Sequence, residues 1–431
     1  MSLAKGLVIA APRSGSGKTT ITLGLLAALR RRGTVVAPAK TGPDYIDPAF
    51  LARAALREAV NLDPWSMGPA QLKSLAATQS VGADLLLVEG VMGLFDGAAD
   101  NTGSTADLAE LLELPVVLVV DAERQSQSVA PLVAGFASWR PGVRVGGVIL
   151  NRVASMKHER MLTEALAATG IPCLGAIPRD ANLVIPERHL GLVLPGEVAS
   201  FETFLDAAAE AIGEYVDLDR LAALAAPLPE TGAPSRPLAP LGQRIAIARD
   251  DAFAFLYPHL LDGWRSLGAE LSFFSPLADE APSPGADAVF LPGGYPELHG
   301  QTIASAQNFK AGLTAARDRD ALIYGECGGF MVLGDALVDK HGVSHAMTGL
   351  LPVTTRIDRP KRILGYRRLA HSGALPWPAQ LNGHEFHYSS AKQSRLPPLF
   401  SATDATGQAL PPMGAAIGRV MGSYAHVVDR G

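Results

Sequence analysis

Short apolar runs alternate with amphipathic segments along the first half of the chain. Apolar runs bounded by turn residues are typical of buried strands, whereas apolar positions repeated every three to four residues are typical of helices. The pattern predicts strands at 6–10, 34–40, 85–89, 116–121 and 145–150, and helices at 19–32, 104–112 and 157–169. This alternation favours a parallel sheet wrapped by helices, with functional residues at the carboxyl ends of its strands.

The pattern stops between 226 and 240, where five prolines and one glycine occur and aromatic residues are absent. Such a composition is typical of a linker between domains. Apolar runs resume at 244–248, 270–274, 288–291 and 321–324. We therefore predict two α/β domains, at 1–225 and 244–431, joined by a proline-rich linker at 226–243.

Composition narrows the class of protein. The chain has 431 residues, of which 48% are hydrophobic and 18% charged, enough for two or three cores. A formal net charge of -5 provides no basic field for nucleic acid. The two cysteines, Cys173 and Cys327, form neither a disulfide framework nor a metal-ligand motif, which favours a reducing compartment such as the cytoplasm. We expect neither a signal peptide nor a membrane span.

A glycine-rich run at 11–20, APRSGSGKTT, lies between the first predicted strand and the first predicted helix. In that context glycines let backbone N–H groups converge on phosphate, a lysine reaches the β and γ phosphates, and a threonine hydroxyl binds magnesium. Pro12 stands where the usual pattern has its first glycine, and a turn without ligand is the alternative. The predicted ATP-binding residues are Ser14, Gly15, Ser16, Gly17, Lys18, Thr19, Thr20 and Asn151.

Three acidic residues and one asparagine follow predicted strands or lie in glycine-rich loops. Asp44 and Glu89 are expected to bind magnesium together with Thr19, and for each of them a loop cap is the less favoured alternative. Asp96, in the loop GLFDG, is suited to approach a substrate or to close a turn. Asn151 follows the strand at 145–150, where it would read adenine or cap a helix.

The second candidate site is Cys327, in the run LIYGECGG at 322–329, where an apolar strand breaks at small residues. Glutamine hydrolysis needs a thiolate, a base and N–H groups that hold an oxyanion. The amide of Gly328 and that of Gly294, in the run FLPGGYPE at 290–297, are the predicted oxyanion hole. A small buried cysteine without chemistry is the alternative reading.

Ten histidines compete for the role of the base. His426 follows a glycine about a hundred residues after the cysteine, and His384 and His387 are the alternatives. The spacing of His384 and His387 fits an alternating strand better than a metal-binding helix. The residues alone leave these three histidines undecided.

Taken together, these motifs resemble one family. The runs at 11–20, 42–47 (GPDYID), 89–97 (EGVMGLFDG), 325–329 (GECGG), 383–389 (GHEFHYS) and 422–426 (GSYAH) span nearly the whole chain in order. They resemble the cobyrinate or hydrogenobyrinate a,c-diamide synthases of cobalamin biosynthesis. The resemblance implies an N-terminal P-loop NTPase domain similar to dethiobiotin synthetase and a C-terminal class I glutamine amidotransferase domain.

The resemblance also implies roles for residues. Cys327 would be the glutaminase nucleophile and His426 its base, while Asp44, Tyr45 and Asp96 would contact the corrinoid. Val428 stands where the wider amidotransferase pattern has an acid two positions after the histidine, so the family implies a Cys-His dyad and leaves open what orients His426. The runs at 383–389 and 249–255 would line the route or interface between the two sites.

The implied reaction is ATP-dependent amidation of the ring carboxylates a and c through acyl phosphates. Its nitrogen is ammonia released from glutamine, and it uses Mg²⁺, in a protein expected to be a homodimer without nucleic acid or membrane partners. The alanine-, glycine- and arginine-rich composition favours a metal-free ring over one that holds cobalt.

Three other readings stay open. Two are relatives of this family: a cobyric acid synthase-like enzyme that amidates other carboxylates of the ring, and an enzyme that acts on a nickel sirohydrochlorin. The third is a P-loop ATPase switch with a silent amidotransferase domain, which the intact Cys327 and His426 disfavour.

Overall fold

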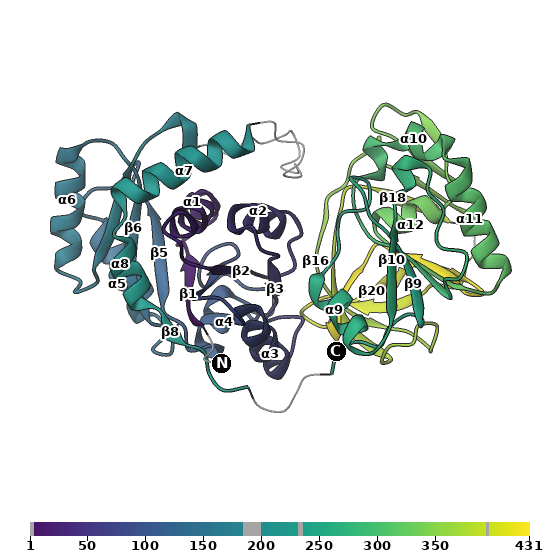
Figure 1. Cartoon of the computed structure of the whole chain (residues 1–431), viewed down its shortest axis with the longest axis horizontal. Helices are drawn as coiled ribbons and strands as arrows, with labels where there is room; N and C mark the ends of the chain where they lie inside the picture. Colours follow the sequence, from purple (N-terminus) through teal and green to yellow (C-terminus); the bar gives the residue numbers. More distant parts are fainter. Residues whose placement is uncertain (1–3, 184–199, 232–235, 394–395) are drawn as a thin grey trace. The chain divides into compact units, whose positions relative to one another are not determined.

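The computed structural model describes residues 4–183, 200–231, 236–393 and 396–431 and divides the chain into two compact units (Figure 1). They are Met1–Ser235 and Arg236–Gly431. The strand β8 (Ala226–Pro227) pairs antiparallel with β1 (Lys5–Ala10). The first two residues of the predicted linker therefore belong to the N-terminal sheet. The limits of the two domains and of the linker otherwise stay a prediction.

The first unit is built on one sheet. Its strand order is β3-β2-β4-β1-β5-β6-β7, all parallel, with β8 beside β1. The remaining strands are β2 (Val36–Thr41), β3 (Val60–Leu62), β4 (Leu85–Glu89), β5 (Val116–Asp121), β6 (Val145–Val153) and β7 (Cys173–Pro178). The central strands are buried on both faces, which explains their nearly continuous apolar sequence.

Helices cover both faces of this sheet. They are α1 (Lys18–Arg31), α2 (Ile46–Ala55), α3 (Pro69–Ser80), α4 (Thr105–Leu111), α5 (Val129–Ser138), α6 (Met156–Ala167), α7 (Phe201–Tyr215) and α8 (Leu218–Leu224), with a short 3₁₀ turn, η1 (Ala181–Leu183). Helices α1 and α7 lie side by side and share the main core with β1 and β4 (Figure 1). That core holds α1 in place, and with it the loop that precedes the helix.

The second unit contains a mostly parallel six-stranded sheet of order β10-β9-β11-β12-β22-β21. Two smaller sheets have the orders β20-β19-β16-β17-β23 and β14-β13-β15-β18. The strands are β9 (Arg244–Ala248), β10 (Glu270–Phe274), β11 (Ala288–Leu291), β12 (Leu322–Glu326), β13 (Ala336–Val338), β14 (Ser344–Ala346), β15 (Val353–Arg356), β16 (Ile363–Ala370), β17 (Gln380–His387), β18 (Ser390–Gln393), β19 (Phe400–Thr403), β20 (Ala409–Met413), β21 (Ala415–Ile417), β22 (Val420–Ser423) and β23 (His426–Arg430).

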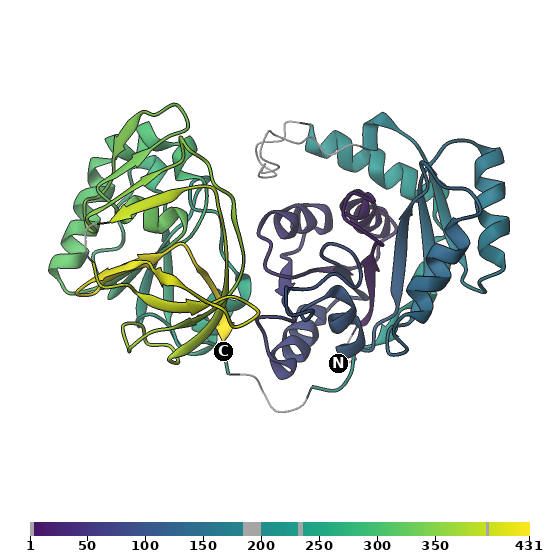
Figure 2. The same ribbon diagram turned by 180° about the vertical axis from the view of Figure 1, so that it is seen from behind.

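Its helical elements are α9 (Pro258–Ser266), α10 (Gly300–Ser305), α11 (Gln307–Asp318), α12 (Gly328–Leu333) and the 3₁₀ turns η3 (Pro276–Ala278) and η4 (Pro296–Leu298). Figure 2 shows the late strands, drawn in yellow, lying beside one another within this unit. Helix α12 packs against β11, β12 and β22, and its buried residues belong to the core of the unit.

The predicted strands and helices are confirmed to within a few residues, and 85–89, 116–121, 244–248, 270–274 and 288–291 agree at both ends. His384 and His387 lie in β17, as the strand reading predicted. The elements that were not predicted include most strands of the two smaller C-terminal sheets, the strands β3 and β7, and the helices α2, α3, α5 and α7 to α11. None of the described helices is long and apolar enough to cross a bilayer.

Candidate functional site

The phosphate loop connects β1 to α1 at the carboxyl edge of the sheet. Gly17 has φ +86°, and a Cβ there would collide with the side-chain amide of Asn151, so only glycine fits both the turn and this close approach. The Ser16 hydroxyl donates to the carbonyl of Arg13 at 3.0 Å, and Lys18 Nζ donates to the carbonyl of Met92 at 3.0 Å. The loop is therefore held in shape by its own contacts.

A cavity of about 680 Å³ opens at this loop. Its lining includes most of the predicted ATP-binding residues, together with basic and acidic neighbours: Arg13, Ser14, Gly15, Gly17, Lys18, Thr19, Thr20, Lys40, Asp44, Asp47, Asn151, Arg152 and Arg179. Ser16 and Glu89 are both buried and do not belong to this lining. The cavity has the size of a nucleotide site, and its lining offers basic side chains to phosphates and acidic side chains to a cation.

A buried lysine that the sequence reading missed lies at the centre of this site. Lys40, in β2, is 2% exposed, and its Nζ lies 2.5 Å from Asp47 Oδ2 and 2.9 Å from Glu89 Oε1. The strand register pairs Lys40 with Glu89, which brings the two side chains together. Burial alone would lower the pKa of Lys40, but Asp47 and Glu89 outweigh it and raise that pKa. The sequence did contain a signal for this residue, because a lysine within an otherwise apolar strand needs an acidic partner.

Glu89 also contacts the phosphate loop. The Thr19 hydroxyl donates to Glu89 Oε1 at 2.8 Å, while Oε2 is buried without a hydrogen-bond partner among the described residues. Burial raises the pKa of Glu89, and Lys40 opposes that rise. A threonine hydroxyl and an unsatisfied carboxylate oxygen beside a phosphate loop fit a Mg²⁺ ion, which uses one or two carboxylates together with phosphates. Within the described residues, no group of three or more His, Cys, Asp or Glu side chains could hold a metal ion without further ligands such as phosphate.

Asp44 faces the cavity from the loop before α2. Its Oδ1 accepts from the Ile46 N–H at 2.9 Å, and the Asn61 side chain donates to the carbonyls of Gly42 and Asp44. Burial, followed by the nearby Asp47 carboxylate, raises the pKa of Asp44 to about 7. Asp47 has its pKa lowered, because Lys40 outweighs the effect of burial. The two carboxylates are therefore unequal, and Asp44 is the one suited to gain or lose a proton near neutrality.

Asn151 supports the loop. Its Nδ2 donates to the carbonyl of Ser16 at 3.0 Å and its Oδ1 accepts from the Arg152 N–H at 3.0 Å. The alternative that Asn151 caps a helix is wrong, because Ser155 is the N-cap of α6. Arg152 has φ 58° and donates to the carbonyl of Gly15 and to Asp121. These contacts brace the loop from the end of β6.

Tyr45 and Asp96 lie outside the cavity lining. Tyr45 is half-buried at the N-cap of α2, next to Asp44. Asp96 is exposed, and its Oδ2 accepts from the Gly93 N–H at 2.9 Å. This contact closes a turn, which was the alternative to a substrate-binding role for Asp96.

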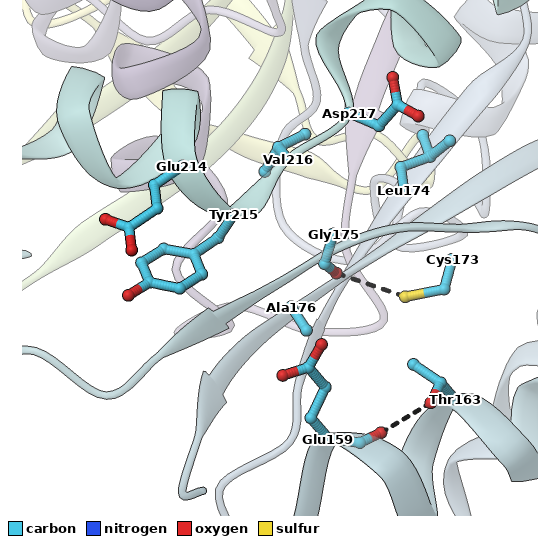
Figure 3. A pocket seen from close by; sticks show the side chains of 10 residues that line it. All are labelled: Glu159, Thr163, Cys173, Leu174, Gly175, Ala176, Glu214, Tyr215, Val216 and Asp217. Carbon is cyan, nitrogen blue, oxygen red and sulfur yellow. Dashed lines mark hydrogen bonds between the residues drawn. The ribbon is translucent and has the colours of Figure 1, made fainter. Parts of the chain in front are cut away.

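Figure 3 shows another pocket of the same unit, with a volume of about 380 Å³, between β7 and the end of α7. Glu159, Glu214 and Asp217 line it, and Cys173 Sγ donates to the carbonyl of Gly175 at 3.4 Å. Its lining contains acidic side chains and no basic ones, so it is unsuited to phosphate.

In the second unit, Cys327 lies at the sharp turn between β12 and α12. Its backbone has φ 46° and ψ -105°, a strained conformation for a residue with a side chain and one that recurs where a nucleophile is presented. The Cys327 N–H donates to the carbonyl of Ser423 at 2.8 Å, and the Gly328 N–H hydrogen bonds to the thiol. The structure thus has the elbow that the sequence predicted.

A glycine loop after β11 lies against this turn. A Cβ on Gly328 would lie 3.1 Å from the backbone N of Gly294, so the two amides predicted to form the oxyanion hole are neighbours. The Phe255 N–H donates to the carbonyl of Gly293 at 3.0 Å. The run at 249–255 therefore supports this loop, whereas its predicted role at an interface between the sites stays a prediction.

The three candidate histidines differ in their contacts. Both ring nitrogens of His387 are engaged, at 2.9 Å from the carbonyl of Ser389 and 3.2 Å from Glu385 Oε1. His384 Nε2 lies 2.8 Å from the hydroxyl of Tyr257. His426 starts β23 and stacks on His384, with 5.0 Å between ring centroids, while a Cβ on Gly293 would collide with its Cε1. His426 therefore lies against the glycine loop, and its Nδ1 lies 3.7 Å from Oε2 of Glu326, the residue before the cysteine.

Burial governs the protonation of this site. It lowers the pKa of His384 to about 3 and that of His426 well below the ordinary value, the latter with further lowering by His384 and His387. Burial also raises the pKa of the Cys327 thiol, and the Glu297 carboxylate adds to this rise. Without a substrate, thiol and imidazole are both neutral, so the thiolate must form as the reaction begins.

Comparisons with known proteins cover the whole chain. Residues 7–193 match the family described as the CobQ/CobB/MinD/ParA nucleotide binding domain, and residues 244–430 match the CobB/CobQ-like glutamine amidotransferase domain. Proteins named hydrogenobyrinate a,c-diamide synthase are similar over the full length. Those of Brucella suis biovar 1 (strain 1330), Rhizobium meliloti (strain 1021) and Rhodobacter capsulatus are 55%, 52% and 49% identical to this chain, and each match covers 98–99% of both sequences.

Proposed function

Because the chain belongs to the family of hydrogenobyrinate a,c-diamide synthases, we propose that it converts the a and c carboxylates of hydrogenobyrinic acid to amides, using ATP and glutamine. The observation that carries the proposal is the presence, in one chain, of a braced phosphate loop at a nucleotide-sized cavity and of a cysteine at a strained turn, next to Glu326, whose carboxylate lies 3.7 Å from His426. The first site would activate a carboxylate, and the second would release ammonia.

In the N-terminal unit, ATP would lie in the cavity at the phosphate loop. Burial, followed by the charge of Lys40, lowers the pKa of Lys18 to about 8. A bound polyphosphate would favour the charged form of Lys18, which then stabilises the transferring phosphoryl group. Asp44, on the rim of the cavity with Tyr45 beside it, and Asp96 would contact the corrinoid.

Thr19 and Glu89 would hold a Mg²⁺ ion, with Asp44, which lines the cavity, as the third predicted ligand. Such an ion neutralises charge on the phosphates. Lys40 and Thr19 both contact Oε1 of Glu89, and this leaves Oε2 without a hydrogen-bond partner among the described residues. The position of the carboxylate is therefore set by the fold before any ligand binds.

The chemistry of the first site is an activation. A carboxylate oxygen of the corrinoid attacks the γ-phosphorus, the bond to the ADP oxygen breaks, and an acyl phosphate forms. Ammonia then attacks the acyl carbon, phosphate leaves, and the nitrogen loses a proton to give the amide. One ATP and one glutamine are used for each carboxylate.

The C-terminal unit would supply the ammonia. His426 takes the thiol proton as Cys327 attacks the side-chain carbonyl of glutamine, and the amides of Gly294 and Gly328 hold the oxyanion. The protonated imidazole then gives its proton to the departing nitrogen, leaving a glutamyl thioester. Water hydrolyses the thioester to glutamate and restores the thiol.

Purified protein with ATP, Mg²⁺, glutamine and hydrogenobyrinic acid tests the proposal by mass spectrometry of the ring. The expected product carries two amides, and cobyrinic acid, the cobalt-containing ring, should react more slowly. Lys18→Met should abolish amidation, because phosphoryl transfer loses its charge partner. Amidation of other carboxylates, or ATP hydrolysis that depends on DNA or a membrane instead of a corrinoid, would contradict the proposal.

A homodimer in the cytoplasm stays part of the proposal. It rests on the family resemblance and on cysteine usage.

A further inference from the structure

An acid is expected to hold the imidazole in glutaminases of this general kind, yet Val428 occupies the position two residues after His426. A histidine that acts as a base toward a thiol needs its other ring nitrogen protonated and fixed by an acceptor. The described structure contains a different candidate for that acceptor. Glu326 lies on β12, immediately before the cysteine.

Glu326, at the end of β12, lies close to His426, at the start of β23. Its Oε2 lies 3.7 Å from His426 Nδ1, and both side chains are 2% exposed. This distance is longer than a hydrogen bond, but catalytic hydrogen bonds are often long in a site without substrate and shorten in the complex. A movement of less than about one ångström would close it.

The other oxygen of Glu326 is fixed. Oε1 accepts from the Val427 N–H at 3.1 Å and from the Tyr324 hydroxyl at 3.0 Å. These two donors orient the carboxylate group and leave Oε2 toward the imidazole. Because Val427 follows His426 directly, the same contact ties the start of β23 to the end of β12.

The imidazole is confined on its other sides. It stacks on His384 and touches Gly293, while the Phe255 ring centroid lies 6.2 Å away. His384 is held in turn by Tyr257. The ring therefore has little freedom to turn, and its Nδ1 edge faces Glu326.

We propose that Glu326 is the positioning residue of the glutaminase site: its carboxylate accepts the Nδ1 proton of His426, so that Nε2 is left as the base for the Cys327 thiol. The inference rests on the proposed function. The acid that orients the imidazole is then the residue immediately before the nucleophile. It takes over the role of the acid that other glutaminases have two positions after the histidine, where this chain has Val428.

Glu326→Gln separates this role from a structural one. The amide keeps an oxygen that accepts from Val427 and Tyr324, so the fold is preserved. Its NH₂ group then faces His426 and donates to Nδ1, which stabilises the wrong tautomer. We expect kcat for glutamine hydrolysis to fall about 100-fold or more with little change in KM.

Tyr324→Phe is the matched control, because it removes a donor to the same carboxylate and leaves the side that faces His426 intact. Its kcat should fall less than about tenfold. Equal losses in the two variants would assign Glu326 a structural role and overturn the inference, as would an unchanged kcat in Glu326→Gln. Amidation with added ammonia should persist in both variants.

A measurement on the unmodified protein covers the case in which Glu326→Gln does not fold. Burial raises the pKa of Glu326 to about 8, so we choose pH 9, where it is ionised. ¹⁵N NMR of the histidines, with His426→Gln for assignment, should find the proton of His426 on Nδ1. A proton on Nε2 overturns the inference, whereas an unmodified protein that does not hydrolyse glutamine contradicts the proposed function itself.

Discussion

A second carboxylate, that of Glu297, bears on the reactivity of the nucleophile. Glu297 lies on η4, whose Pro296 packs against the start of α12. Burial raises its pKa to about 7, and its charge adds to the rise in the pKa of Cys327 caused by burial. Above neutral pH, the ionised Glu297 therefore opposes formation of the thiolate in the site without substrate.

Glu297→Gln should lower the pKa of Cys327, because a neutral amide no longer repels the thiolate. In a Cys173→Ser background, with a single cysteine left to react, alkylation by iodoacetamide at pH 9 should be roughly three- to tenfold faster than with Glu297. The pH profile of the alkylation rate should move to lower pH. An unchanged profile would show that Glu297 does not act on the thiol.

Single residues of the site could be predicted from sequence where a motif names them, as for Lys18 and Cys327. Lys40 and Glu326 could not, because each acts through a partner on another strand. The register of β2 with β4 brings Lys40 to Glu89, and β23 brings His426 to Glu326. Neither pairing is encoded in local spacing.

At the scale of elements, the packing of α1 on α7 supports the phosphate loop. Gly24 lies in this contact, and a Cβ there would lie 2.7 Å from Ile212 Cγ1 and 2.9 Å from the carbonyl oxygen of Ala208. Gly213, in the last turns of α7, has open space around its Cα. The two glycines share a helical backbone and differ in what surrounds them.

Gly24→Ala and Gly213→Ala should therefore have opposite effects. Gly213→Ala gains helix propensity and should stabilise the unit by about 0.5–1 kcal/mol. Gly24→Ala forces the two helices apart and should destabilise it by about 1–3 kcal/mol. Hydrogen exchange of peptides from α1 and α7 measures both changes within this unit. Stabilisation by both substitutions would contradict the close packing.

Several of the predicted strands share one property. Strands such as β4 and β5 are buried on both faces, so their apolar runs are continuous and bounded by turn residues. Strands β13, β14 and β21 have only three residues each, too few for a period to emerge. Helix α5 was missed because its sequence is apolar almost throughout, without the alternation that marks a helix.

At the scale of the whole molecule, we propose two chemistries in two units of one chain. In this proposal the N-terminal unit activates a carboxylate, and the C-terminal unit releases the ammonia that attacks it. The fold class of both units could be predicted from two glycine-rich runs and the strands around them. The predicted contacts of Tyr45 and Asp96 with the corrinoid stay a prediction, since both residues lie outside the lining of the cavity at the phosphate loop.

The most direct test compares two nitrogen sources in Cys327→Ser. The substitution replaces the thiol with a poorer nucleophile and leaves the phosphate site intact, so glutamine-dependent amidation of hydrogenobyrinic acid should be lost. Amidation with added ammonia should continue at a rate close to that of the unmodified protein, measured at a pH near 9 where more of the ammonia is unprotonated. If ammonia also fails to restore the diamide, the assignment of activation and ammonia release to separate sites is wrong.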